Sequence, residues 1–425
     1  MSRTTTRIAV LTLGVAMTAS MVACSSGDGG TPTLNYYGDA SSLGMDKVLA
    51  SCSAASNGRY TIRGNLLPSD ADGQREQLVR RLAAKDSGLD IIGPDVTWTA
   101  EFAEAKWIEP LTGERATRAT TGVLQPPIDT ATWKGKLYAI PKSTNVQLLW
   151  YRKSLVPNPP KTWDEMFDQA DALRKAGKPH EIGLTAAQYE GYVVAFNTLL
   201  SSYGGTVVNA DSTRTTLGKP AVQALSLLKR LATSGSANAS LSNSQEPEVF
   251  AQLQKGQAAF ILNWPYVQSA MTTAAETDPQ SKKVLDDMAA TGYPQAVPGT
   301  PAKVTLGGRN LAVSAFSKHK DLAFEAAFCM ASADSQRNQA TAAGDVPVLK
   351  SLFDDPEVQK AFPQYPIILQ ELNTAVARPI SPLYQNISTV ISTTLSPPRS
   401  INPESTERKL AKSIQQALEG KGILP

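Results

Sequence analysis

The stretch LDIIGPD, residues 89–95, is a short apolar strand that ends in a Gly-Pro turn and an aspartate. It is the last of five segments in which strand-like and helix-like patterns alternate. In order, we predict a strand at 33–37, a helix at 45–55, a strand at 60–63, a helix at 74–85 and a strand at 89–92. Such an order predicts an α/β fold built on a parallel sheet.

Further along the chain the alternation continues with longer apolar helices. Strands are predicted at 147–151, 257–263, 303–308 and 311–313, the last two on either side of a glycine hinge. Helices are predicted to begin at the Thr162 capping box, near 192, 221, 249 and 322, and after the Asn402 cap. About 400 residues follow the N-terminal segment, which is enough for two lobes with separate cores.

The N-terminal segment has the features of a secretory signal. Two arginines precede an apolar run that is shorter than the roughly 20 residues of a membrane span, and small residues then lead to Cys24. This pattern resembles a bacterial lipobox, which implies that residues 1–23 are removed and that a diacylated Cys24 anchors the chain to the outer face of the cell membrane. The alternative is an ordinary secreted protein cut near Ala23. The polar, Gly-rich residues 24–32 predict a flexible tether.

Composition and motifs argue against several classes of function. The net charge is only +3, from 41 basic and 38 acidic residues, without a basic stripe, so we expect no nucleic-acid partner. The two histidines and the two cysteines other than Cys24 do not fall at zinc-ligand spacing, so we expect no metal and no cofactor. The sequence has no G-x-S-x-G, H-E-x-x-H or Cys-His motif, which favours a binding protein over an enzyme. A glycan-active enzyme that uses two carboxylates is the alternative.

Several segments together resemble the extracellular solute-binding proteins of carbohydrate ABC importers. They are LDIIGPDVTWTAEFAEAKWIEPL (89–111), KGQAAFILNWPYV (255–267) and KVTLGGRNLAVS (303–314). Within that family, TNVQLLWYR (144–152) and ARPISPLYQNIS (377–388) resemble the trehalose-binding lipoproteins of mycobacteria and corynebacteria. One departure from the mycobacterial form is a shorter stretch between Trp264 and Lys303, which would alter ligand choice if that stretch lines the site.

The resemblance implies a two-lobed periplasmic-binding-protein-like fold of type II, with a ligand cleft between lobes that are joined by crossover hinges. It places lobe 1 at 33–143 plus 307–347 and lobe 2 at 144–306 plus 348–425. The expected ligand is trehalose or a close disaccharide, and the expected partners are the transmembrane permease subunits of an ABC importer. We expect a monomer. Another sugar, such as maltose or an amino sugar, or a glycerophosphodiester, is the alternative ligand.

A disaccharide site needs flat aromatic surfaces for C–H faces and fixed polar groups for hydroxyls. Trp264 follows an apolar strand and is the predicted stacking platform, with Tyr266 as a weaker candidate. The alternative for Trp264 is a place in the core, which we expect for Trp150. Asp95 also follows a strand and is predicted to accept hydroxyl hydrogens, with an Asx turn as the alternative.

Three more polar residues are candidate ligand contacts. Asn145 lies at the junction into the second region, where its amide would donate and accept, and a turn role is the alternative. The family resemblance implies a ligand carboxylate near Glu246, which we expect to be extended because it precedes Pro247; Glu248 is the rival. Arg378 offers a planar fork of donors that would bridge two hydroxyls, unless it forms a salt bridge within the C-terminal region.

The remaining candidates are a glycine and three polar residues. Gly308 would let the backbone approach the sugar closely. Asp39, after the first strand, is a further hydroxyl partner. Gln74 and Glu190 are weaker candidates, because such residues are more often solvated or cap a helix.

Cys52 and Cys329 remain as an even pair in an oxidising compartment, which predicts a disulfide. Both flanking segments are assigned to lobe 1, so the bond would join two helices of that lobe. The alternative is two buried free thiols.

Overall fold

The computed structural model describes residues 30–39 and 44–421 of the chain. The predicted signal peptide, Cys24 and most of the tether lie outside these residues, and so does the side chain of Asp39. In the described part of the chain, no helix is long and apolar enough to cross a membrane.

A six-stranded sheet organises the first lobe. Its order is β12 (Val346–Pro347), β6 (Ile140–Asn145), β11 (Gly307–Val313), β3 (Ile91–Ile92), β1 (Thr33–Asp39) and β2 (Thr61–Leu67). Strands β2, β1 and β3 are parallel, as the sequence predicts. Strand β11 is antiparallel to both β3 and β6, so the sheet is mixed. This change of direction occurs where a segment distant in the sequence returns to the first lobe.

A four-stranded sheet organises the second lobe. Its order is β10 (Met288–Thr291), β7 (Leu148–Arg152), β9 (Ala258–Asn263) and β8 (Glu181–Gly183). Every residue of β9 is buried, which explains the apolar run at 258–262 that precedes its last residue, Asn263. A separate two-stranded ribbon consists of β4 (Thr132–Trp133) and β5 (Lys136–Leu137).

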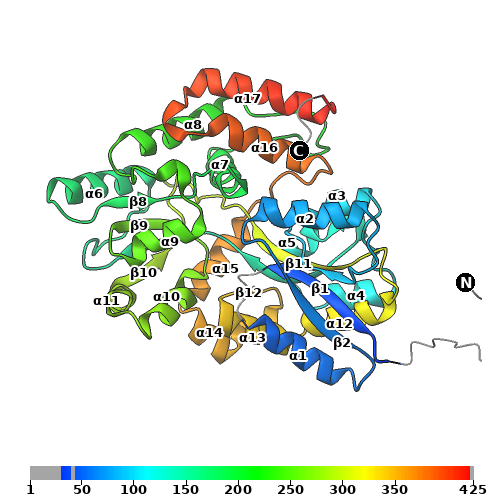
Figure 1. Cartoon of the computed structure of the whole chain (residues 1–425). Coiled ribbons are helices and arrows are strands. Elements are labelled where there is room, and N and C mark those ends of the chain that lie inside the picture. Colours follow the sequence, from blue (N-terminus) through cyan, green and yellow to red (C-terminus); the bar gives the residue numbers. More distant parts are fainter. Residues whose placement is uncertain (1–29, 40–43, 422–425) are drawn as a thin grey trace, which may run out of the picture. The chain divides into compact units, whose positions relative to one another are not determined.

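Helices surround both sheets (Figure 1). In the first half of the chain they are α1 (Met45–Ala55), α2 (Ala71–Ala83), α3 (Thr99–Glu104), α4 (Glu114–Thr120), α5 (Gln125–Thr130), α6 (Trp163–Lys175) and α7 (Glu190–Ser202). Those that follow are α8 (Lys219–Thr233), α9 (Glu246–Gln254), α10 (Val267–Ala275), α11 (Pro279–Asp287), α12 (Lys320–Met330), α13 (Ala333–Ala343), α14 (Pro356–Ala361), α15 (Tyr365–Thr374), α16 (Tyr384–Leu395) and α17 (Pro403–Leu418). The C-terminal helix α17 packs on α8 and α16, and α16 packs on α7, which joins distant parts of the sequence in lobe 2 (Figure 1).

Local signals set the ends of these helices as expected. The Thr162 hydroxyl caps α6 by accepting from the Glu165 amide at 3.1 Å. Asn402 caps α17 by accepting from the Ser405 amide at 3.3 Å, and Pro403 occupies the first turn. Helix α1 matches its predicted range.

Two hydrophobic cores lie beneath the two sheets. One contains Leu34, Ile91, Phe102 and Ala327 in lobe 1, and the other contains Trp150, Phe196 and Phe260 in lobe 2. The chain passes from the first sheet to the second between β6 and β7 and returns between β10 and β11. It leaves the first sheet again after β12.

One predicted pair of strands is wrong. Residues 303–306 form no strand with the first sheet; Thr305 instead makes a single bridge to Val376. Gly307 and Gly308 begin β11 rather than separating two strands. The backbone groups of this return segment are satisfied by neighbours from lobe 2, such as the hydroxyl of Thr198, which accepts from the Thr305 amide at 3.0 Å.

The predicted disulfide between Cys52 and Cys329 is present. It joins α1 to α12, two helices that both pack in lobe 1, with Cα atoms 5.7 Å apart. The bond therefore braces lobe 1 without crossing to lobe 2.

Candidate functional site

The ends of β6 and β9 and the start of β11 meet at one place. Asn145, the last residue of β6, pairs with Gly307, the first residue of β11, and Trp264 directly follows β9. A Cβ atom on Gly307 would lie 2.1 Å from Asn145 Oδ1 and 3.0 Å from the Trp264 ring. Any side chain at Gly307 would therefore displace both residues, and the glycine brings the indole and the amide against the same stretch of backbone.

Gly308 must be a glycine for a different structural reason. Its φ is +138°, and a Cβ there would lie 2.3 Å from the Ser143 carbonyl oxygen of the neighbouring strand. The close approach that requires a glycine is thus between β11 and β6. The glycine whose missing side chain leaves room for Trp264 is Gly307, one residue earlier.

Glu246 lies beside Trp264. Its Oε1 accepts from the Trp264 indole N–H at 3.4 Å, and its Oε2 accepts from the Tyr189 hydroxyl. The expectation that Glu246 is extended is wrong, because Glu246 is the first residue of α9 and Pro247 fits that first turn. Glu248 is exposed and accepts from the Gln245 amide at 3.0 Å as part of a capping box.

Asn263, the last residue of β9, orients this group. Its Oδ1 accepts from the Trp264 amide at 2.9 Å, and its Nδ2 donates to the Glu246 carbonyl oxygen at 3.1 Å. The hydroxyl of Tyr266 donates to the same carbonyl at 3.1 Å. Tyr266 therefore helps to hold the first turn of α9 in place. Its ring lies near that of Phe250, with centroids 6.2 Å apart.

Arg378 joins carboxylates from the two lobes. Its Nη1 donates to Glu190 at the start of α7, and its Nη2 donates to Asp95 Oδ1 at 3.3 Å. Arg378 and Glu190 are 5% and 6% exposed, so this pair is almost completely shielded from water. The salt bridges are therefore not the alternative predicted within the C-terminal region, because both partners lie outside it, Glu190 at the start of α7 and Asp95 in lobe 1.

Glu190 is satisfied from several sides. Besides Arg378, the Tyr384 hydroxyl donates to it at 2.5 Å and the Ser388 hydroxyl donates to its other oxygen. Burial raises the pKa of the Glu190 carboxyl, although Arg378 opposes this. The hydroxyls of Tyr384 and Ser388 fix the position of the Glu190 carboxylate. The carboxylate in turn holds the Arg378 guanidinium in place.

Asp95 combines a turn role with an open oxygen. Its Oδ1 accepts from the Thr97 amide at 3.0 Å and the Thr97 hydroxyl at 2.9 Å, which is the Asx turn weighed as an alternative. Within the described residues its Oδ2 has no partner, so one carboxylate oxygen remains for another donor.

We call Asp95, Asn145, Glu246, Trp264 and Arg378 the interlobe cluster. The consecutive residues Tyr189 and Glu190 connect its two ends, because Tyr189 bonds Glu246 and Glu190 bonds Arg378. Two buried polar atoms of the cluster lack partners in the described structure: the acceptor Asn145 Oδ1 and the donor Arg378 Nε. Trp264 is half-buried. The cluster thus offers an aromatic ring, carboxylates, an amide and a guanidinium, the groups that a polyhydroxyl ligand requires.

Comparison with known proteins agrees with this architecture. Residues 47–364 match the family model described as bacterial extracellular solute-binding protein. The chain belongs to this family. Its family consists of solute-binding proteins, which supports the expectation of a binding protein, and the predicted two-lobed, type II fold is confirmed by the solved structures below.

Individual relatives of this solute-binding protein cover most of its length. A Deinococcus radiodurans protein, named as a probable ABC transporter-binding protein, is 28% identical over 82% of this chain and 83% of its own. The galactooligosaccharide-binding protein of Bacillus subtilis is 26% identical over 53% and 52% of the two chains. The maltose-bound T. maritima MalE3 superposes with a TM-score of 0.81, 26% identity and coverage of 90% and 99%. A Thermotoga lettingae solute-binding protein bound with α-D-tagatose shares the fold, with a TM-score of 0.79, 21% identity and coverage of 92% and 100%.

The site of this solute-binding protein also contains residues that sequence reasoning passed over. Asp72 on α2 accepts from the Gln385 side chain at 3.0 Å and from the Glu190 amide at 3.3 Å, so it joins lobe 1 to α16 and α7. Gln74, a weak candidate, is buried and accepts from Arg309 at 2.9 Å. The one available signal was Glu190 itself, the single charged residue of α7, a helix whose residues are all buried.

One other expectation has a plain outcome. Trp150 is in the core of lobe 2, as expected, and its indole donates to the Asn263 carbonyl oxygen at 3.1 Å. In the described part of the chain, no group of His, Cys, Asp and Glu is arranged to hold a metal ion.

Proposed function

We propose that this chain is the solute receptor of an ABC sugar importer and that its ligand is a neutral disaccharide, trehalose or a close relative. The observation that carries the proposal is the pair of unpartnered buried atoms, Asn145 Oδ1 and Arg378 Nε, in a cluster that also presents an indole ring. A buried polar atom without a partner costs about 1–3 kcal/mol. Both atoms are covered by protein atoms in this arrangement, and we propose that small shifts of their side chains on binding let a sugar offer a hydroxyl donor to the first atom and a hydroxyl acceptor to the second.

Each residue of the interlobe cluster then has a distinct part. The Trp264 ring stacks on the C–H face of one sugar unit. The open oxygen of Asp95 and the carboxylate of Glu246 accept hydroxyl hydrogens, and Asn145 and Arg378 complete the contacts to hydroxyls on either side. Asp39 is proposed as a further hydroxyl partner, and Gly308 allows the backbone of β11 to reach the ligand.

The class of ligand is supported by two kinds of likeness. The maltose-bound and the galactooligosaccharide-binding relatives carry sugars in their names, and MalE3 aligns over nearly the whole chain. The choice of trehalose rests on the sequence segments around Asn145 and Arg378 that resemble trehalose-binding lipoproteins. The absence of free basic groups in the cluster disfavours a phosphodiester, since Arg378 is already paired with two carboxylates.

The arrangement also supports a closing mechanism. Arg378 and Asp72 each make bonds between the lobes, so the site is completed only when the lobes are together. A sugar that contacts both lobes favours this closed arrangement by the contacts it adds there. We further propose that Cys24 carries a lipid that keeps the receptor at the outer face of the membrane. In this proposal lobe 1 comprises 33–143 plus 307–347, lobe 2 comprises 144–306 plus 348–425, and a monomer presents the closed form to the permease.

The test is calorimetric titration of the soluble chain from Ser25 to Pro425 with trehalose, maltose, sucrose, glucose and glycerophosphocholine. We expect a micromolar dissociation constant for trehalose, roughly −8 kcal/mol, and much weaker binding of maltose. Tight binding of another sugar would discard trehalose and keep the sugar receptor. Failure of every sugar to bind, or turnover of a chromogenic glycoside, would overturn the proposal.

A further inference from the structure

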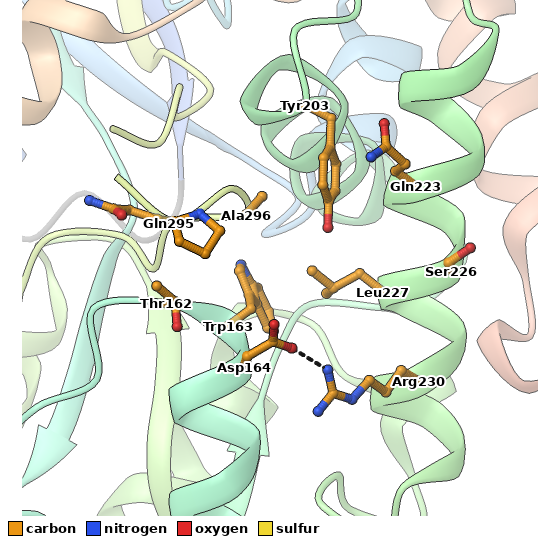
Figure 2. A pocket seen from close by; sticks show the side chains of 11 residues that line it. Thr162, Trp163, Asp164, Tyr203, Gln223, Ser226, Leu227, Arg230, Gln295 and Ala296 are labelled. Carbon is orange, nitrogen blue, oxygen red and sulfur yellow. Dashed lines mark hydrogen bonds and ion pairs between the residues drawn. The ribbon is translucent and has the colours of Figure 1, made fainter. Parts of the chain in front are cut away.

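A pocket in lobe 2 shares no residue with the interlobe cluster (Figure 2). It has a volume of about 260 Å³ and is formed by the first turn of α6, Tyr203 at the end of α7, one face of α8 and the loop at 295–298. Pockets for drug-sized ligands measure roughly 300–1,000 Å³. This one therefore suits a smaller molecule, of about one ring.

The pocket contains a fixed donor without an acceptor. The indole nitrogen of Trp163 has no hydrogen-bond partner, although the side chain is only 2% exposed. Figure 2 shows this nitrogen pointing into the space between Tyr203 and Gln295. The rings of Phe167 and Tyr293 pack beside the indole, with centroids 5.9 and 6.2 Å away, and hold its orientation. The nitrogen is covered by protein atoms in this structure, so a ligand oxygen would accept from it once a neighbouring side chain moves aside, and would then supply the missing partner.

The other polar groups of the pocket are neutral and able to donate or accept. The Tyr203 hydroxyl and the Gln223 amide point toward the pocket in Figure 2. Burial and the nearby Asp164 raise the pKa of Tyr203, so its hydroxyl keeps its proton. The side-chain oxygen of Gln295 accepts from the Gly299 amide at 2.8 Å, and its amide group points away from the pocket in Figure 2.

The charges in the pocket cancel each other. Asp164 forms an ion pair with Arg230, and the Arg230 guanidinium also lies 4.1 Å from the Phe167 ring centroid. The start of α6 is not open to an anion, because the Trp163 amide donates to the Gln295 backbone carbonyl and Thr162 caps the Glu165 amide. This pattern favours an uncharged ligand over a phosphate or a carboxylate.

We propose that this pocket is an accessory site for a single neutral sugar ring or similar small polyol, separate from the site proposed between the lobes. A ring oxygen or hydroxyl accepts from the Trp163 indole, and hydroxyls on the opposite edge of the ring exchange hydrogen bonds with Tyr203 and Gln223. The apolar floor at Leu227 contacts the C–H groups.

The experiment follows the indole N–H signals in ¹H–¹⁵N spectra of a Trp264→Ala variant, which keeps five of the six tryptophans, and Trp163 is assigned by the loss of its signal in Trp163→Phe. D-glucose is titrated into a Trp264→Ala background, so that binding at the interlobe cluster does not contribute. We expect the Trp163 signal to shift saturably with a millimolar midpoint. The signal of Trp133, which is bonded to Glu104 on lobe 1, is the internal control and should stay in place.

Two further arms make the result decisive. The double variant Tyr203→Phe, Gln223→Ala should weaken the glucose midpoint at least tenfold while its melting temperature stays within a few degrees. Inorganic phosphate should not shift the Trp163 signal. No saturable shift with glucose, a midpoint unchanged in the double variant, or a stronger response to phosphate would each overturn the accessory sugar site, without bearing on the receptor function.

Discussion

The indole N–H of Trp264 donates to Glu246 Oε1 at 3.4 Å, although 18 residues separate the two in the sequence. The end of strand β9 supplies the tryptophan and the first turn of α9 supplies the glutamate, and Asn263 holds both through their backbones. The ring and the carboxylate are therefore positioned as one unit, which suits the recognition of a sugar face and its adjacent hydroxyl.

Trp264→Ala should weaken trehalose binding by about 100-fold or more, because it removes the stacking surface and frees Glu246 from its indole partner. Trp264→Phe should recover part of the loss, since it restores a ring but no N–H. Titration calorimetry measures both. The matched control is Trp133→Ala, which removes a surface tryptophan of lobe 1 and should leave the affinity unchanged. Equal affinity for wild type and Trp264→Ala would remove this residue from the site.

Arg378→Ala should destabilise the protein by about 3–5 kcal/mol, because it leaves the buried Glu190 carboxylate without its cation. The double variant Arg378→Met, Glu190→Gln should regain most of that stability, since the more deeply buried carboxylate is removed together with its cation and only the partly exposed Asp95 loses its ion pair. It should not regain sugar binding, because the donors to the ligand are still missing. Chemical denaturation and calorimetry separate the two effects. Full sugar affinity in the stable double variant would show that Arg378 only holds the fold together.

Asp72→Ala should weaken the binding of every sugar several-fold and to a similar extent, which corresponds to about 1 kcal/mol. Asp72 bonds Gln385 and the Glu190 amide across the lobes, so its loss disfavours the closed arrangement whatever the ligand is. Calorimetric titration of wild type and variant with two sugars gives the ratio of the two affinities, and this ratio should not change. Glu76→Ala, an exposed change on the same helix, is the control. A change in the preference between the sugars would instead place Asp72 in direct contact with the ligand.

The double variant Cys52→Ser, Cys329→Ser should lower the free energy of unfolding by about 2–5 kcal/mol. The bond closes a loop between residues 277 positions apart, and its loss frees the unfolded chain. Sugar affinity should stay the same, because α1 and α12 both belong to lobe 1. Melting curves with and without a reductant offer an independent check: a melting temperature that does not respond to reduction would contradict a stabilising bond.

Glu371→Gln should raise the stability above pH 7 and change it little near pH 5. Burial raises the pKa of Glu371 from 4.5 to about 7, although the Tyr293 amide donates to it at 3.2 Å. The folded protein thus holds a proton that the unfolded chain releases, so the favourable contribution at low pH is lost as the pH rises from 4.5 to about 7. The gain in the variant at pH 8 should reach at most about 3 kcal/mol.

Melting temperatures of wild type and Glu371→Gln across pH 5 to 8 test this dependence. Glu404→Gln is the control, because Glu404 is exposed at the start of α17 and should show no such trend. An equal shift at both ends of the range would mean that the carboxyl titrates normally.

Much of the fold follows from short-range patterns. Apolar spacing and caps were enough to locate α1, α6, α17 and β9, because a helix or strand is favoured mainly by residues within a few positions of each other. The same reasoning placed Trp264 and Asp95 at strand ends, which tend to face a ligand in α/β lobes, and Asn145 at the junction into the second region. The pairing of Cys52 with Cys329 followed from counting the cysteines.

What the sequence by itself determined was therefore the class of fold, the cysteine pair and the candidate residues at strand ends. Only the tertiary structure decided which glycine lies against Trp264, that Glu190 anchors Arg378, and that Asp72 reaches Gln385, 313 positions away. These relationships depend on how the lobes pack. A buried charge or a close backbone contact has no local signature, since its partner comes from a distant part of the chain.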